Sequence, residues 1–441
     1  MSRQNGRIIG LGLAVWCILD LVCAMLCEIH ADEAYYRLYG QFLAWGYFDH
    51  PPMVGLMTAL SDALVPATGV AVSGWALVLK NLSVRLTTVL VHVVTVYVVW
   101  RTIRTGHDER NMFLRFLLVA ASIPMFSAYG FITAPDAPML FFAAVFYYAY
   151  RNYLDKRTWS LAILLGVSMA GLLYSKYIAV LIILFAVLGN LRLLRDGKCW
   201  AAVGIAALLM LPHLWWQYSN GFPSFTYHLV SRATAYSPLY SLEFIPNQWA
   251  VFNPLVWCLM LWAGWTQLRQ GDAFYRSLGV TLIGFQVFFL LMTIRGHVEP
   301  HWTIVTAIPA ILLLTENACI RKRGIQIALG VCAGLVIVAR AVLMLNILPV
   351  QTGLAGKQPQ YEAIHAEAQG SPVIFDGSFQ QASLYRFYYN DEAVLVRNAG
   401  DRYTQFDLLH LERALLGQPA CVRRFGQVYL TDELSMEDLR E

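Results

Sequence analysis

The chain has 441 residues, of which 58% are apolar and only 14% are charged. An average soluble domain carries about 25% charged residues, so this composition excludes an ordinary soluble domain, a nucleic-acid binder and a disordered chain. The net charge of +4 is modest, so the positions of Lys and Arg along the chain matter more than their number.

Apolar runs of roughly 15 to 22 residues recur from the N-terminus to about residue 349, and a membrane-spanning helix needs about 20. The first run is longer than the apolar core of a signal peptide and is followed by further runs, so we expect it to be retained. The pattern predicts about eleven spanning helices, near residues 8–28, 83–100, 112–128, 137–150, 159–174, 177–191, 200–216, 247–267, 274–294, 302–316 and 324–348.

Basic residues are concentrated in alternate connections between these runs. Several Lys or Arg residues lie in each of five connections, near residues 101–110, 151–157, 192–198, 269–276 and 321–323, whereas the opposite connections hold only scattered ones. Because short cytoplasmic loops are enriched in Lys and Arg, this bias predicts that the N-terminus is inside and the C-terminus outside.

Two outer loops are unusually long. The first, about residues 29–82, contains two amphipathic stretches, 33–45 and 51–65, each of which is predicted to form a helix in the plane of the membrane interface. Pro51 and Pro52 fit the first turn of the second helix, where a missing N–H costs nothing. The second long loop runs from about residue 217 to residue 246.

The composition changes after Pro349. Residues 371–441 are mixed and charged, with strand-like runs at 372–375 and 393–396. We therefore expect two domains: a transmembrane domain at 1–350 and a small α/β domain at 351–441 on the outer side. The expected fold class is an all-α polytopic membrane protein with this small extracytoplasmic domain.

Polar residues cluster at five places, all on the outer side by this topology. The first is Asp32-Glu33, directly after the first span and followed by Tyr35. An alternative interpretation of Asp32 is a helix N-cap, because a carboxylate there accepts bonds from free N–H groups.

The second polar cluster is Asp49-His50, where the prolines that follow fix the backbone. One straight helix would separate Asp32 from Asp49 by about 25 Å, so they share a site only if the chain turns back, and Gly46 is expected to end the first helix.

The third and fourth clusters are Asp136, between two prolines at the mouth of the fourth span, and Lys176-Tyr177 in a short connection. Asp136 alternatively caps a helix whose early positions hold proline. Lys176 lies at membrane depth near the outer surface, where lysine often extends harmlessly to water. A fixed cation beside acids could equally hold a phosphate.

The fifth cluster precedes the tenth span and includes His297, Glu299, His301 and Trp302. Their alternate spacing is compatible with a divalent metal, but on an extended loop the same residues also occur as ordinary polar positions beside an interfacial tryptophan.

Two further basic residues are anion-binding candidates. Arg232 is the only Lys or Arg of the second long loop, and Arg340 lies about 13 Å inside the last span, where a charge is a functional hypothesis by default.

Acids, cations and interfacial helices on one outer face suit a transfer from a lipid-linked phosphate donor. A carboxylate takes the proton of the acceptor and makes it a nucleophile. Basic side chains stabilise the leaving phosphate as charge develops on it. Grooves between spans hold the lipid tail.

Four stretches of the chain resemble glycosyltransferase family 39, which contains protein O-mannosyltransferases and the aminoarabinose transferases of lipid A: residues 32–52, 135–138, 176–177 and 301–302. The resemblance covers the membrane part and is weak in the last ninety residues. It implies a GT-C fold, a polyprenyl-phosphate sugar donor and inverting transfer at the outer face of the membrane, with a lipid, glycan or protein acceptor. For a bacterial chain this means the cytoplasmic membrane with a periplasmic active site.

The resemblance also implies residue roles. Asp32 matches the acid proposed as catalytic base, and Glu33 is its usual neighbour. Asp49 stands where the aminoarabinose transferases have a Glu before Lys-Pro-Pro, so His50 replaces that Lys. Asp136 matches an acid lining the cavity, and Lys176 a basic residue near the donor phosphate. The residues expected to bind substrate or phosphate are thus His50, Tyr35, Asp136, Lys176, Tyr177, Arg232, Arg340 and Trp302.

No cofactor is certain, because some family members are metal-independent while a divalent ion has been associated with others. Asp49, His297, Glu299 and His301 are the candidate ligands. Three other functions stay open: a transporter or flippase of a lipid-linked sugar, an assembly factor whose first loop binds a partner, and hydrolysis with water as acceptor. A transporter predicts ionisable residues near mid-membrane and symmetric halves, of which the sequence offers only Arg340.

Overall fold

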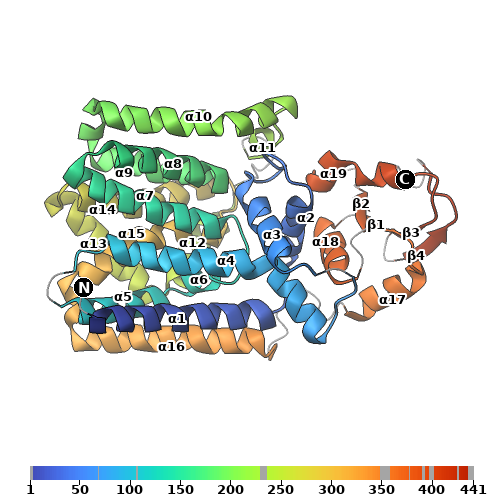
Figure 1. Cartoon of the computed structure of the whole chain (residues 1–441), viewed down its shortest axis with the longest axis horizontal. Helices are drawn as coiled ribbons and strands as arrows, with labels where there is room; N and C mark the ends of the chain where they lie inside the picture. The colour runs from blue at the N-terminus through green and yellow to red at the C-terminus, as the bar shows by residue number, and fades with distance from the viewer. Residues whose placement is uncertain are drawn as a thin grey trace. The chain divides into compact units, whose positions relative to one another are not determined.

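The computed structural model describes residues 3–67, 69–105, 108–228, 236–347, 358–376, 378–389, 393–396, 402–424 and 427–435. Figure 1 shows the arrangement of its elements. The α-helices are α1 (Arg3–Leu26), α2 (Ala31–Gln41), α3 (Met53–Leu64), α4 (Gly74–Thr102), α5 (Glu109–Ala121), α6 (Pro124–Ala128), α7 (Asp136–Lys156), α8 (Trp159–Ser175), α9 (Val180–Gly189), α10 (Gly197–Ser219), α11 (Pro223–Thr226), α12 (Pro238–Phe252), α13 (Pro254–Gln270), α14 (Ala273–Met292), α15 (Ala307–Glu316), α16 (Arg323–Met344), α17 (Gln358–Ala368), α18 (Phe379–Tyr388) and α19 (Gln405–Leu409).

Shorter elements complete the described chain. The 3₁₀ turns are η1 (Tyr177–Ala179), η2 (Leu191–Arg195), η4 (Thr293–Arg295), η5 (Pro300–Thr306), η6 (Ala318–Arg321) and η7 (Leu411–Leu415). The strands are β1 (Val373–Asp376), β2 (Val394–Val396), β3 (Ala420–Arg424) and β4 (Gln427–Thr431).

A helix lies at each of the eleven predicted apolar runs, and several runs are interrupted. The third run divides into α5 and α6 before Pro124, whose missing N–H suits a helix start. The eighth divides into α12 and α13 at Asn253, which has φ +60° and caps α13. Within the described ranges, five helices are long and apolar enough to cross a membrane: α1, α4, α10, the stretch from α14 through η4, and α16. The number of spans therefore stays a prediction.

The chain folds into two compact units. The helical unit comprises Met1–Leu21, Thr88–Phe131 and Pro135–Arg340, and the mixed unit comprises Val22–Thr87, Ile132–Ala134 and Ala341–Glu441. The mixed unit thus combines the first long loop with the residues after the last predicted span. Sequence order alone predicts these as parts of separate domains.

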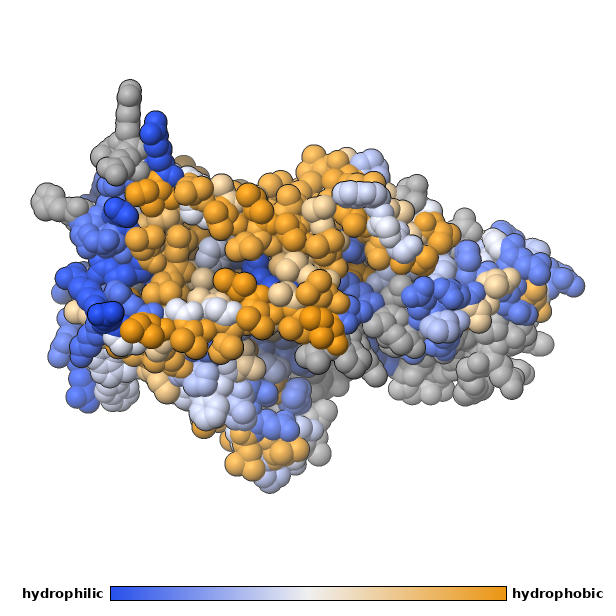
Figure 2. All heavy atoms as spheres, turned by 90° about the horizontal axis from the view of Figure 1, so that it is seen from below, coloured by the Kyte–Doolittle hydropathy of each residue, from blue (hydrophilic) through white to orange (hydrophobic). Residues whose placement is uncertain are grey.

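In the helical unit, α8 packs against α7 and α10, and α14 packs against α9 and α13 (Figure 1). Many of its large apolar side chains face outward, including Ile327, Val331 and Leu335 of α16. Figure 2 shows an apolar surface over these helices with hydrophilic residues gathered at one end. Such a surface is expected of helices that face lipid rather than water.

The mixed unit has one hydrophobic core to which both parts of its sequence contribute. Tyr35, Tyr39 and Tyr47 of the first loop share this core with Tyr361, Phe375 and Tyr385 of the C-terminal segment. The sheet has the order β2-β1-β3-β4, with β1 parallel to β2 and β3, and β4 antiparallel to β3. The structure thus confirms the strands predicted at 372–375 and 393–396 and adds β3 and β4.

Helices α2 and α3 match the two predicted amphipathic stretches. They pack closely because Gly40 has no side chain: an added Cβ would lie 2.4 Å from Thr58 Oγ1 and 2.7 Å from the backbone nitrogen of Ala59. Two predicted details are wrong. Helix α2 ends at Gln41, before Gly46, and Pro52 is the N-cap of α3 rather than a residue of its first turn. The second long loop is also shorter than predicted, because α12 begins at Pro238.

Candidate active site

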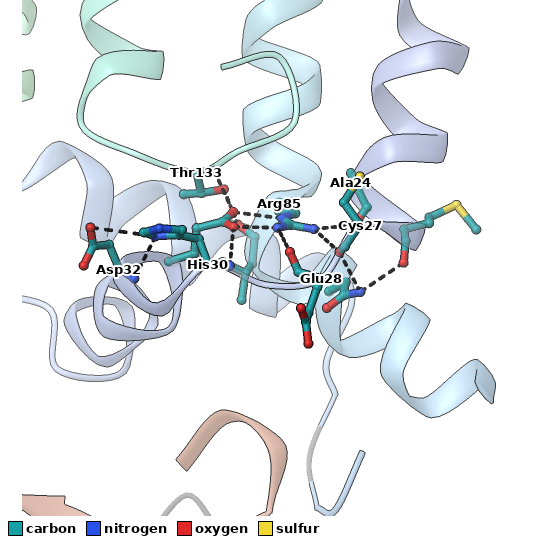
Figure 3. Close-up of polar contacts among 11 residues, drawn as sticks. Ala24, Cys27, Glu28, His30, Asp32, Arg85 and Thr133 are labelled. Carbon is teal, nitrogen blue, oxygen red and sulfur yellow. Dashed lines mark hydrogen bonds and ion pairs between the residues drawn. The ribbon is translucent and has the colours of Figure 1, made fainter. Parts of the chain in front are cut away.

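Asp32 lies in the first turn of α2 with its carboxylate at the surface. The cap of this helix is His30, whose Nδ1 accepts a hydrogen bond from the Asp32 N–H at 3.2 Å. The carboxylate of Asp32 is 43% exposed, lies 3.7 Å from His30 Nδ1 and accepts a 3.1 Å bond from Gln380 Nε2. Figure 3 shows the His30 ring facing Asp32. Since His30 provides the cap, the Asp32 carboxylate is accessible to a substrate.

Glu33, the neighbour of Asp32, is fully buried in an ion pair. Arg85 of α4 donates to its two oxygens at 2.8 and 2.5 Å, and the backbone N–H groups of Thr133 and His30 donate at 2.8 and 3.0 Å. The same guanidinium binds the carbonyl groups of residues 24, 27 and 28 at the end of α1 (Figure 3). These contacts hold Glu33 at the start of α2, in the same turn as Asp32.

Asp49 is a buried carboxylate held by an arginine of the C-terminal segment. Its Oδ2 lies 2.6 Å from Arg402 Nη2. Burial, with a smaller contribution from the charge of Asp32, raises the pKa of Asp49 to about 6. The Arg402 charge and a hydrogen bond from Tyr35 act in the opposite direction. Asp32 therefore acts electrostatically on Asp49, which means that the chain turns back after α2 as the sequence requires.

Two more predicted residues surround this pair of carboxylates. The Tyr35 hydroxyl accepts a 2.6 Å bond from the N–H of Gln405, and the Phe48 N–H donates to the side chain of Gln405 at 2.9 Å. His50 Nε2 lies 3.3 Å from the hydroxyl of Tyr36. Residues from α2, from the turn before α3 and from the C-terminal segment thus meet in one site within the mixed unit, which we call the Asp32 cluster: Asp32, Tyr35, Asp49, His50, Gln380 and Arg402.

The helical unit holds a second group of predicted residues, the Asp136 cluster: Asp136, Lys176 and His301. Asp136 is the first residue of α7 and Lys176 follows α8, and the lysine Nζ donates to both carboxylate oxygens at 2.9 and 2.8 Å. Both side chains are buried, and His301 Nε2 lies 3.9 Å from Asp136. A buried lysine paired with one carboxylate still presents further donors to an anion.

The other predicted residues of this unit lie among aromatic and polar neighbours. Tyr177 lies 3.1 Å from His213 Nε2 and accepts a 2.9 Å bond from Gln217. Trp302 packs on Phe289 with ring centroids 5.6 Å apart.

The residues proposed as metal ligands do not gather into one site. His297 faces Glu299 at 3.8 Å, whereas His301 faces Asp136. Over the part of the chain that the structure describes, no three His, Cys, Asp or Glu side chains are placed to hold a metal ion. Among these described residues, the predicted donors His297, Glu299 and His301 therefore do not form a metal site.

Arg340 belongs to a buried polar group of the helical unit. Its Nη2 lies 2.7 Å from Asp20, which also contacts His92 Nδ1 at 2.8 Å, and its Nε donates to Ser127 at 2.9 Å. The sequence interpretation named Arg340 and overlooked Asp20 and His92. The pairing with Asp20 explains how the Arg340 charge is accommodated inside the predicted last span, without a bound substrate as its partner. Arg232 lies outside the described residues.

Three functional residues escaped prediction: Arg85, Gln380 and Arg402. Arg85 is a single charge within an apolar run, and nothing near it in the sequence indicates a role. Arg402 is separated from its partner Asp49 by 353 positions. No local pattern links such pairs. The one available signal was Glu33, since a carboxylate that is to be buried needs a cation from elsewhere in the chain.

Comparison with known proteins supports the resemblance. A family model described as dolichyl-phosphate-mannose-protein mannosyltransferase matches residues 49–216. The lipid A galacturonosyltransferase RgtD of Rhizobium johnstonii is 25% identical over 346 residues, which cover 75% of this chain and 69% of that protein.

The fold is that of solved GT-C structures. ArnT from Cupriavidus metallidurans matches in the apo state and bound to undecaprenyl phosphate, with a TM-score of 0.68 for each. The sequence identities are 14% and 16%, and the matches cover 96% and 94% of this chain and 93% and 92% of ArnT. The predicted resemblance to GT-C glycosyltransferases is thereby confirmed, and the chain is a multi-pass membrane protein of this fold.

Proposed function

From this GT-C glycosyltransferase fold, we propose that the protein transfers a sugar from a polyprenyl-phosphate donor to a hydroxyl or phosphate group of an acceptor, with inversion at the anomeric carbon. The observation that carries the proposal is the Asp32 cluster, where an accessible carboxylate lies beside a buried one held by Arg402. The exposed carboxylate is available to take a proton, while Arg402 holds its buried neighbour in position and favours its ionised form.

In the proposed reaction Asp32 acts as general base. The acceptor O–H proton passes to its carboxylate, the acceptor oxygen bonds to the anomeric carbon, and the bond from that carbon to the lipid phosphate oxygen breaks with its electron pair leaving on phosphate. Separately from the role of Asp32, we propose that Lys176 of the helical unit binds a donor phosphate, since its Nζ is buried and fixed by Asp136. General base catalysis contributes about 10² to 10⁴ in rate.

The similar proteins support the proposed donor and acceptor classes. ArnT binds undecaprenyl phosphate and RgtD is named a lipid A galacturonosyltransferase, which supports a polyprenyl-phosphate sugar as donor and a lipid A type of glycolipid as acceptor. The alternation of basic connections supports a bacterial cytoplasmic membrane with the site facing the periplasm. The transporter alternative rested on the deep charge of Arg340, which Asp20 and His92 now explain.

The test compares turnover of radiolabelled polyprenyl-phosphate sugars by wild type and by Asp32→Asn, each purified with a lipid A acceptor. We expect the variant to lose at least about 10² in rate while it still binds donor, because the change removes a base and almost no volume. Glu367→Gln is the control, since Glu367 is an exposed carboxylate of the same unit. Retained turnover in Asp32→Asn, or equal loss in Glu367→Gln, would refute the assignment.

A further inference from the structure

A polar cavity lies at the end of α7 opposite to Asp136. Helix α7 runs from Asp136 to Lys156, so its ends are about 30 Å apart. The cavity, of about 760 Å³, is formed by the end of α7, the link from α9 through η2 to α10, and the start of α14. Six basic and three acidic residues line it, which is an excess of positive charge at the end predicted to be cytoplasmic.

The three acidic residues are all occupied by bonds inside the protein. Asp155 pairs with Arg104. Asp196 accepts hydrogen bonds from the Tyr153 hydroxyl at 2.8 Å and from the Lys198 N–H at 3.0 Å. Burial raises the pKa of Asp196, but these two bonds and the nearby charges of Arg157 and Lys198 outweigh burial. The pKa of Asp196 is therefore below its ordinary value. Asp272 accepts from the N–H groups of residues 274 and 275 at the start of α14. Asp196 is in electrostatic range of Arg157 and Lys198, but none of the three carboxylates forms an ion pair with Arg157, Arg192 or Arg195 in the described part of the chain.

Three of the cations lack such an internal acid. Arg151 is bound to Glu316 at 2.7 Å and Arg104 to Asp155, whereas Arg157, Arg192 and Arg195 have no carboxylate within ion-pair distance among the described residues. All three are exposed at the cavity. Three guanidinium groups that form no ion pair among the described residues, around a cavity of this size, favour an anion with several hydrogen-bond acceptors, such as a phosphate group.

Exposed apolar side chains lie close in sequence to residues that line the cavity. The turn η2 has the sequence Leu191-Arg-Leu-Leu-Arg195, in which Leu191 precedes the first arginine and Leu194 the second; these leucines are 59% and 49% exposed. Trp159 and Trp200 are 58% and 57% exposed, and Lys198 Nζ lies 5.3 Å from the Trp159 ring centroid. Exposed tryptophan beside arginine and leucine is the pattern of a membrane interface, where a headgroup meets acyl chains.

We propose that this cavity binds the phosphate headgroup of an anionic phospholipid, with Arg157, Arg192 and Arg195 on the phosphate and the acyl chains along Leu191 and Leu194. Basic pockets between helices on the cytoplasmic side suit such headgroups. A soluble phosphate would use the arginines alone and would gain nothing from the apolar border. The site is separate from the proposed transfer, so its test does not depend on turnover.

The experiment titrates the delipidated full chain in detergent with dioleoyl phosphatidylglycerol, with dioleoyl phosphatidylcholine and with inorganic phosphate, and measures binding by native mass spectrometry and by the thermal midpoint. We expect phosphatidylglycerol to bind and to raise the midpoint, and the other two probes to do neither. Binding of inorganic phosphate with the same affinity as phosphatidylglycerol would overturn the lipid assignment.

Two double variants test the location of the site. Arg192→Gln/Arg195→Gln should weaken phosphatidylglycerol binding about 30-fold, and Arg192→Gln alone about 5-fold, since each basic residue near a lipid surface contributes a similar increment. Arg321→Gln/Arg323→Gln is the matched control: the same charge is removed from exposed positions that do not line the cavity. Unchanged binding in the first variant, or equal weakening in both, would show that no specific site exists here.

Discussion

The raised pKa of Asp49 predicts an acid limit on transfer. Burial brings this pKa to about 6 from its ordinary 3.8, and the Arg402 guanidinium, 2.6 Å away, keeps it from rising further. Below pH 6 the carboxyl is protonated and its pairing with Arg402 is lost. We therefore expect kcat/KM to fall as the pH decreases through about 6.

Arg402→Gln removes the charge that favours ionisation, so it should move this limit to a higher pH. The measurement is the pH profile of kcat/KM for wild type, Arg402→Gln and Arg413→Gln, the last being an exposed arginine of the same unit as control. A profile that does not move in Arg402→Gln would show that Asp49 does not control the acid limb.

The two histidines proposed as metal ligands should differ in effect. His301 lies 3.9 Å from the buried Asp136, whereas His297 and Glu299 are 44% and 38% exposed and contact each other. We expect His301→Asn to lower turnover several-fold and His297→Asn to leave it nearly unchanged. A chelator should affect neither protein, and mass spectrometry of the purified chain should find no stoichiometric metal. A bound ion lost in both variants would restore the metal site.

At the scale of elements, the buried pair of Asp20 and Arg340 fastens α16 to α1. Asp20→Asn alone leaves a buried guanidinium without its counter-ion, which costs about 3–5 kcal/mol of folding free energy. Asp20→Asn/Arg340→Met should recover most of that loss, because no buried charge remains. Denaturant unfolding in detergent measures both. The exposed pair of Arg104 and Asp155 provides the control, and Asp155→Asn should change stability little. Equal losses in the single and double variants would contradict this role of the pair.

The elements themselves were largely predictable, because period and composition are local. Helices α2 and α3 follow from apolar residues at helical spacing, and β1 and β2 from short β-branched runs. The errors lie at the boundaries of helices. Gly46 looks like a helix end, but α2 ends at Gln41, where Phe42 closes the last turn by donating to the carbonyl groups of Leu38 and Tyr39. Gly40 was unremarkable in sequence and proves to be needed for the contact with α3.

For the whole molecule, sequence order was a poor guide to what packs together. Residues 351–441 read as a separate domain, yet Phe379, Phe406 and Tyr385 share a core with Tyr35 and Tyr39 of the first loop. The pairing of Asp49 with Arg402 arises from that shared core. The periodicity of a sequence carries no information about contacts between residues 353 positions apart. The acids Asp32 and Asp49 could therefore be predicted from their local sequence, but the partner Arg402 could not.

This shared core gives a prediction about truncation. Ending the chain at residue 350 removes Arg402, Gln405 and Gln380 and exposes the aromatic side chains of α2. Each such side chain contributes about 1.5–3 kcal/mol when buried, so α2 and α3 should lose their fixed arrangement while the helical unit keeps its own core. We expect loss of transfer together with rapid proteolysis near residues 42–52.

The control is a chain that ends at residue 435 and retains every contact described for the mixed unit; it should keep both its activity and its resistance to protease. Limited proteolysis with mass spectrometry locates the cuts, and the radiolabel assay measures turnover. If the chain ending at 350 kept its first loop protected and its turnover intact, the C-terminal segment would be a separate module. The contacts of Arg402 and Gln405 would then have no part in shaping the site. Loss of both properties together would instead show that the acids of the first loop depend on the end of the chain for their position.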